Sequence, residues 1–181
     1  MQNKITTKVV NLWGGPGTGK STTSAELFSE MKWLGYNVEM VTEVAKDVVW
    51  DGHFNLLQDQ WYLSAMQNRR LARLIGQVEY VITDSPLLMG TMYMDATIPQ
   101  SLKDSILDIW NTYDNINFML KRVKPYVKVG RTQDEADARL IDDKCRFTLK
   151  QLGEPFYEII ADRNGKIEIL KVLKVLEGKC R

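Results

Sequence analysis

Residues 14 to 21 constrain the fold of this chain more than any other segment. They read Gly-Gly-Pro-Gly-Thr-Gly-Lys-Ser, a full match to the phosphate-loop pattern G-x-x-x-x-G-K-[ST]. Glycine tolerates backbone angles that other residues avoid, so successive N–H groups can turn inward around a polyphosphate. An apolar strand at 8–13 enters the segment and a helix at 21–34 leaves it, with its N-terminus against the phosphates. The pattern predicts a nucleoside triphosphate site.

The residue types in the loop assign an expected role to each position. Lys20 supplies a mobile positive charge for the β- and γ-phosphates, and Ser21 supplies a hydroxyl ligand for Mg²⁺. The sequence has no Asn-Lys-x-Asp guanine signature, which favours ATP over GTP. We therefore expect ATP and Mg as cofactors. The expected nucleotide-binding residues are Gly15, Pro16, Gly17, Thr18, Gly19, Lys20, Ser21 and Thr22.

Two carboxylates follow later strands. An expected strand at 38–42 ends in Glu43, and another at 80–83 ends in Asp84. Ligands of open α/β sheets bind outside the carboxyl ends of the strands, where both side chains would lie. Asp84 is expected to hold Mg²⁺ directly or through water. For Glu43 a catalytic role competes with a simpler one, a favourable acid at the start of a helical turn.

The residues after Asp84 bear on the type of reaction. Ser85 and Pro86 stand where motor-type ATPases usually carry a glutamate that activates water. The sequence therefore favours phosphoryl transfer to a substrate over hydrolysis.

A long helix is expected over 54–75, with Gln60 and Gln67 close to one face. A glutamine amide presents a donor and an acceptor together, which suits recognition of a base or amide edge. Both glutamines are therefore candidate substrate residues. A solvated helix edge is the alternative for each.

Residues 121–131 carry five positive charges and also contain proline and glycine. The segment 121–135 is a candidate lid over the phosphates, in which Arg131 would neutralise charge that develops during transfer. The expected helix at 133–152 adds Arg139, a candidate substrate residue, and Arg146. A solvated basic loop and a clamp for a DNA backbone are the alternatives.

Composition and element order favour one α/β domain over residues 1–181, with a parallel sheet between helices. Further helices are expected at 100–113 and after 165, and further strands at 117–120 and 155–160. A net charge of +1 gives no general attraction to nucleic acid or membrane. The sequence shows no apolar run long enough to span a bilayer and no signal peptide, and we expect its two cysteines, Cys145 and Cys180, to be free thiols. We therefore expect a cytoplasmic protein.

Over nearly its whole length the chain resembles the small P-loop kinases, especially compact AAA-type proteins common in bacteriophages and related to ribosylnicotinamide kinase domains. The resemblance is carried by 14–22, 41–47, Asp59-Gln60 with Gln67, 81–88, 122–126 and 130–133. It implies a P-loop NTPase fold with a five-stranded parallel sheet in the order 2-3-1-4-5. The loop 162–165 after the last strand would then lie near the adenine.

The resemblance also implies roles for individual residues. Glu43 would contact or deprotonate the acceptor hydroxyl, Asp84 would be the Mg²⁺ ligand or the base, and Arg131 would be a lid arginine. The sequence departs from deoxynucleoside kinases, which commonly carry Asp-Arg-Ser where Asp84-Ser85-Pro86 stands here. This departure leaves the acceptor open.

Together these features predict an ATP- and Mg-dependent kinase whose acceptor is a nucleoside or nucleotide. A kinase acting on a modified base or end within DNA is one alternative, and a nucleotide-dependent ATPase switch without a small acceptor is another. The oligomeric state is left open.

Overall fold

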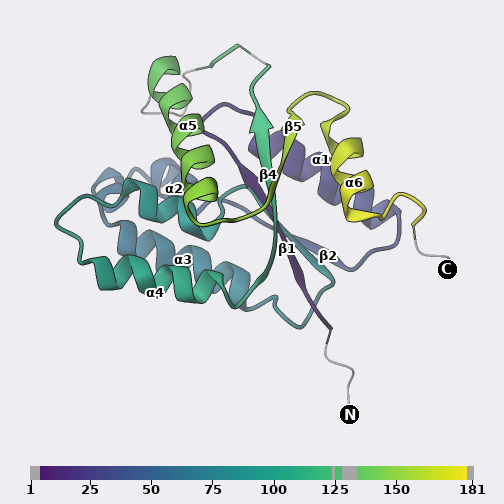
Figure 1. Ribbon diagram of the computed structural model, residues 1–181, viewed down its shortest axis with the longest axis horizontal. Coiled ribbons are helices and arrows are strands. Elements are labelled where there is room, and N and C mark those ends of the chain that lie inside the picture. Colours follow the sequence, from purple (N-terminus) through teal and green to yellow (C-terminus); the bar gives the residue numbers. More distant parts are fainter. Residues whose placement is uncertain (1–4, 124, 128–133, 179–181) are drawn as a thin grey trace.

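The computed structural model describes residues 5–123, 125–127 and 134–178. Figure 1 shows a central sheet between helices. The strands are β1 (Lys8–Trp13), β2 (Val38–Val41), β3 (Tyr80–Thr83), β4 (Asp114–Lys121) and β5 (Phe156–Ile160). The helices are α1 (Lys20–Trp33), α2 (Val44–Trp50), α3 (Gln60–Ala72), α4 (Gln100–Trp110), α5 (Glu135–Gln151) and α6 (Gly165–Leu173), with 3-10 helices η1 (Phe54–Gln58) and η2 (Leu87–Tyr93).

The sheet is parallel and its strand order is β2-β3-β1-β4-β5, which confirms the expected topology. β1 lies in the middle, where Val10 pairs in register with Ile82 of β3 and Ile116 of β4. Because all strands run the same way, the residues that follow β1, β2 and β3 meet at one edge of the sheet. The phosphate loop, Glu43 and Asp84 are the residues brought to that edge.

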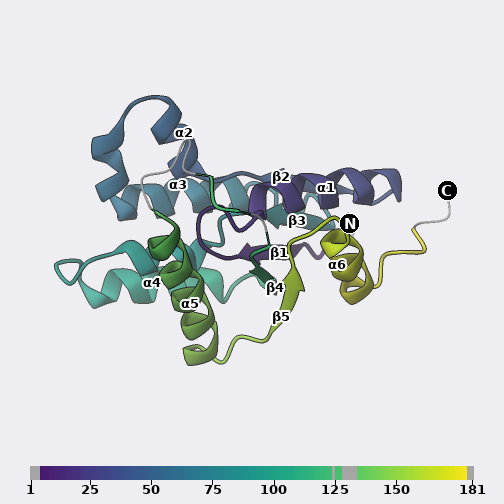
Figure 2. The same ribbon diagram turned by 90° about the horizontal axis from the view of Figure 1, so that it is seen from above.

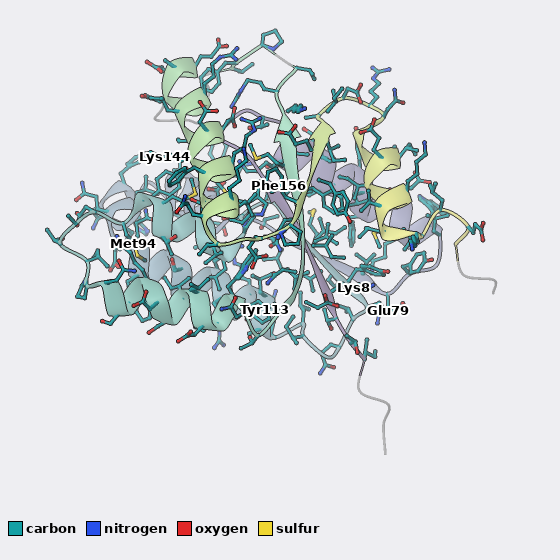
Figure 3. The ribbon with its side chains drawn as sticks, in the orientation of Figure 1. Lys8, Glu79, Met94, Tyr113, Lys144 and Phe156 are labelled. Atoms are coloured by element: carbon teal, nitrogen blue, oxygen red, sulfur yellow. The ribbon has the colours of Figure 1, made fainter. Side chains whose placement is uncertain are left out.

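Two apolar cores hold the helices on opposite faces of the sheet (Figure 2). On one face α3, α4 and α5 cover a core in which the rings of Trp13 and Trp110 meet edge to face at 5.9 Å. On the other face Leu27 of α1 and Ile169 of α6 pack against the sheet. Figure 3 labels Tyr113 and Phe156, which both pack against the first of these cores.

The expectation of one helix over 54–75 is wrong. The segment forms η1 and then α3, which ends at Ala72. Asp59 separates the two because its carboxylate accepts a hydrogen bond from the N–H of Tyr62 at 2.9 Å and so begins α3. Gly76, at φ 80°, ends the turns that follow α3. Apolar periodicity alone did not reveal this break, because a 3-10 turn preserves similar spacing over a few residues.

Other boundaries differ from expectation as well. β4 is longer than the expected 117–120 and spans 114–121. Residues 87–93, for which no element was expected, form the 3-10 helix η2. No helix in the described part of the chain is long and apolar enough to cross a membrane.

Candidate active site

A cavity of about 560 Å³ opens at the carboxyl edge of the sheet, between the phosphate loop and the elements α2, α3 and η2. It lies at the opposite end of the strands from Lys8 and Glu79, which Figure 3 labels near the start of β1 and β3. Both expected halves of a kinase site contribute to it. The lining includes Pro16, Gly17, Gly19, Lys20, Ser21 and Thr22 on the loop side and Glu43, Gln60, Ser64, Gln67, Gly90 and Tyr93 on the other.

The phosphate loop joins β1 to α1 through glycines in the left-handed region. Gly17 has φ 75°, and Gly19, at φ 108°, is the residue from which α1 begins. These angles disfavour other residues, so glycine is required at both positions by conformation. Lys20 folds back over the loop, where its Nζ donates to the carbonyl oxygens of Gly14 at 2.7 Å and Gly15 at 3.1 Å. Its charge is thereby held at the mouth of the loop.

Ser21 and Asp84 meet in space, although 62 residues separate them in sequence. The hydroxyl of Ser21 donates to Oδ2 of Asp84 at 2.6 Å. Asp84 is only 3% exposed, and its Oδ1 has no hydrogen-bond partner among the described residues. Mg²⁺ prefers oxygen ligands, and a buried carboxylate oxygen without a partner beside a hydroxyl suits it. The pair therefore fits a magnesium ion bound next to the phosphates.

Glu43 faces the same cavity from the end of β2. It is the N-cap residue of α2, yet its side chain makes no capping hydrogen bond. Burial raises the pKa of Glu43 above its ordinary value of 4.5; the charge of Lys20 lowers it and that of Asp84 raises it. A carboxylate that is not used as a cap, and that shares its electrostatic environment with Lys20 and Asp84, is suited to proton transfer.

The two glutamines of α3 both line the cavity, but their amides already bind the protein. Gln67 Oε1 accepts from the N–H of Val44 at 3.0 Å, and its Nε2 donates to the carbonyl of Thr42 at 3.4 Å. Gln67 thus holds the backbone on both sides of Glu43. Gln60 donates through Nε2 to the carbonyl of Leu57 at 2.6 Å. Contact of either glutamine with a substrate stays a prediction.

The wall opposite the phosphate loop is largely apolar. Leu63 of α3 and Leu87 and Met89 of η2 contribute to it. Ser64 lies between these elements, and its buried hydroxyl has no partner among the described residues. It lies so near Gly90 that a Cβ there would come within 2.3 Å of its Oγ.

Tyr93 is at the end of the same wall. Burial raises the pKa of its hydroxyl, and the charge of Glu43 raises it further. Tyr93 therefore stays neutral and can donate a hydrogen bond near Glu43. Neither Ser64 nor Tyr93 was expected from the sequence, because no motif marks them.

The lid residues are only partly described. Arg131 lies outside the described residues, whereas Pro125 and Val127 of the same segment line the cavity. Arg139 is exposed and donates to Glu135 at 2.7 Å, one turn away on α5. Arg146 pairs with Glu158 at 3.2 Å. The structure thus brings Glu43, Asp84 and the loop together, but Arg139 is not among the described residues that line this cavity.

The loop after β5, where an adenine contact was expected, runs close to the phosphate loop. A Cβ at Gly19 would lie 3.4 Å from the Cβ of Ala161, directly before that loop. The loop is a turn in which Oδ1 of Asp162 accepts from the N–H groups of Asn164 and Gly165. The adenine contact of 162–165 stays a prediction.

Arg122 and Asp142 were not expected as functional residues. They form a buried ion pair behind the phosphate loop, and both bind the loop. Arg122 belongs to the basic segment at 121–131, but the sequence does not distinguish it from its neighbours. Asp142 gives a clearer signal, because it falls between Ala138 and Cys145 on the apolar face of α5. A charged residue on such a face needs a partner.

Fold and site together define a P-loop protein with a parallel sheet in the order β2-β3-β1-β4-β5. Residues 9–166 match the model of a family described as an AAA domain, and the chain belongs to this family. None of the curated proteins matches the sequence.

Solved structures share the fold at low sequence identity. A NadR protein in complex with NR superposes with a TM-score of 0.67 at 14% identity, covering 97% of this chain and 54% of that one. The present chain thus spans about half the length of that protein. Deoxyadenosine kinase from M. mycoides, solved with dCMP and dCDP, superposes with a TM-score of 0.53 at 20% identity, covering 92% of this chain and 99% of that one. The same kinase with bound dATP superposes with a TM-score of 0.56 at 18% identity, covering 92% of this chain and 98% of that one.

Proposed function

We propose that the protein is an ATP- and Mg-dependent kinase that transfers the γ-phosphoryl group to a hydroxyl of a nucleoside-like acceptor. One observation carries this proposal: Glu43, Lys20 and Ser21 line a single cavity, and the hydroxyl of Ser21 donates to Asp84. A carboxylate opposite a phosphate loop is placed to receive the proton of an attacking hydroxyl. The kinase fold of NadR and deoxyadenosine kinase is consistent with it.

Each side chain then has a defined task. The acceptor oxygen forms a bond to the γ-phosphorus, the bond from that phosphorus to the ADP oxygen breaks, and Glu43 takes the hydroxyl proton. Lys20 stabilises negative charge on the phosphoryl oxygens as it develops. Ser21 and Asp84 would hold Mg²⁺, which supplies further charge neutralisation when bound. Positioning and electrostatics account for most of the rate in such a reaction.

The lining favours a neutral acceptor over a nucleoside monophosphate. Among the described lining residues the charged ones are Lys20, Glu43 and Lys46, and no arginine is present. A phosphorylated acceptor would bring its dianion close to Glu43 without a bidentate partner on this wall. The apolar wall instead suits a planar base.

A phosphate-fate assay tests the proposal. Wild-type protein and Lys20→Ala are incubated with Mg·ATP and, separately, deoxynucleosides, nicotinamide riboside, deoxynucleoside monophosphates and single-stranded DNA. The proposal expects phosphorylated product with a nucleoside, lost in Lys20→Ala. Product on DNA alone would favour the DNA-end kinase. If free phosphate is the only product, and if its rate of release is the same with every acceptor, the result would favour an ATPase switch and overturn the proposal.

A further inference from the structure

A buried ion pair lies directly behind the phosphate loop. Nη2 and Nε of Arg122 approach Oδ2 of Asp142 at 3.1 and 3.3 Å. The side chains are 6% and 10% exposed, so water does little to screen the two charges. The described residues that line the cavity include neither of them. The contacts of the pair with the phosphate site therefore run through the loop.

Both members of the pair bind the loop backbone. Oδ1 of Asp142 accepts a hydrogen bond from the N–H of Gly15 at 2.5 Å. Nη1 of Arg122 donates to the carbonyl of Pro16 at 2.8 Å, and Nη2 donates to the hydroxyl of Thr18 at 3.3 Å. The loop is thus fixed through one donor and two acceptors on its outer side. Such fixing can keep its remaining N–H groups turned towards a phosphate.

The placement of the pair links the loop to the candidate lid. Arg122 directly follows β4, before the segment 123–134, and Asp142 lies in α5, after it. α5 packs tightly on the loop, because a Cβ at Gly15 would come within 2.3 Å of the carbonyl oxygen of Ala138. Arg122 and Asp142, which precede and follow this segment in the sequence, therefore both contact the backbone of the phosphate loop.

The charge of Asp142 poses a problem that Arg122 resolves. A buried carboxylate next to a phosphate-binding loop repels the polyphosphate that the loop is built to hold. We propose that Arg122 and Asp142 are positioning residues: Asp142 orders the loop through Gly15, and Arg122 cancels its charge so that nucleotide can bind. This inference uses only the nucleotide-binding part of the proposed function.

Nucleotide affinity in charge variants tests this inference. The dissociation constant of Mg·ADP is measured by calorimetry for wild type, Arg122→Gln and the double variant Arg122→Gln/Asp142→Asn. Arg122→Gln leaves Asp142 unpaired, so we expect affinity to fall about tenfold or more. The double variant removes the unpaired charge and keeps an oxygen that can accept from Gly15. It should regain most of the lost affinity.

Two further variants sharpen the comparison. Lys32→Gln is the control: it removes an exposed ion pair, in which Lys32 Nζ lies 3.0 Å from Glu39 Oε1, and should leave the affinity for Mg·ADP unchanged. Arg122→Lys keeps the positive charge but not the planar guanidinium group. Its affinity for Mg·ADP should lie between those of wild type and Arg122→Gln.

The inference is overturned if Arg122→Gln binds Mg·ADP like wild type, if the double variant binds no better than Arg122→Gln, or if Arg122→Lys is no better than Arg122→Gln. Equal losses in all three variants would mean that the pair serves packing alone. If Arg122→Gln does not fold, the remaining variants decide. The inference is then overturned when both Arg122→Lys and the double variant bind Mg·ADP about tenfold more weakly than wild type, or weaker still. A wild type that binds Mg·ADP but transfers no phosphate would sink the kinase proposal and leave this inference standing.

Discussion

Glu43 joins the stability of the protein to its proposed chemistry. A carboxylate that accepts a proton must be charged before the reaction, yet burial raises the pKa of Glu43 and disfavours its charged form. Lys20, which lines the same cavity, lowers the pKa and offsets part of this cost. Such a compromise between stability and reactivity is typical of active sites.

Replacing Glu43 with Gln should remove the part of the pH dependence of the free energy of unfolding that comes from this carboxyl group. Because the folded-state pKa is raised, the relative stability that Glu43 contributes is present below its ordinary pKa of 4.5 and is lost as pH rises through the folded-state value. The difference between Glu43→Gln and wild type should therefore grow in favour of the variant from acid to neutral pH. Denaturant unfolding across that range measures it. A difference that does not change with pH would contradict the burial of this carboxylate.

Ser64 and Gly90 allow a second test at the residue scale. A Cβ at residue 90 would lie 2.3 Å from Oγ of Ser64 but 3.6 Å from its Cβ. We expect Gly90→Ala to destabilise the protein by about 1–3 kcal/mol through overpacking. Ser64→Ala/Gly90→Ala removes the clashing oxygen and should recover most of that loss. Denaturant unfolding of the two variants checks this, and a double variant as unstable as Gly90→Ala would show that Ser64 is not the obstacle.

At the scale of elements, α5 packs directly on the phosphate loop. Gly15 has no Cβ, which lets the carbonyl of Ala138 approach its backbone. Figure 1 shows α5 over the same end of the sheet as the loop between β1 and α1. Glycine is thus needed at position 15 for the packing of α5, in addition to its place in the phosphate-loop motif.

Gly15→Ala should displace α5. The new Cβ would meet Ala138 O at 2.3 Å and Asp142 Oδ1 at 3.1 Å, so the helix must shift away. We expect faster hydrogen exchange across 135–151, together with weaker Mg·ADP binding. Unchanged exchange in α5 with unchanged binding would contradict the close approach. Gly15 is not in the left-handed region, so backbone strain would not confuse the result.

The elements also show where sequence patterns succeed and where they stop. The segments around the phosphate loop were predictable because glycine geometry and apolar periodicity agree there. The break at Asp59 depended on one side chain accepting the N–H of Tyr62, which periodicity does not register. Asp142 carried a usable signal, a charge on an apolar helix face, whereas its partner Arg122 is known only from tertiary contacts.

At the scale of the whole molecule, the sheet order was the most predictable property. Alternating strands and helices with a phosphate loop after the first strand leave few topologies, and the resemblance implied the one observed. The acceptor wall was less predictable. It forms where α3 packs against η2, and 3-10 helix η2 has no sequence signal of its own. The fold is shared with NadR and deoxyadenosine kinase at identities that carry no substrate information.

The most direct test of the central claim is phosphoryl transfer by Glu43→Gln. The rate of product formation on the best nucleoside acceptor and the dissociation constant of Mg·ATP are measured in parallel for wild type and variant. If Glu43 is the base opposite the loop, transfer should fall at least about 100-fold while nucleotide affinity changes little. Transfer at the wild-type rate would contradict the account, because Glu43 would then have no part in the chemistry.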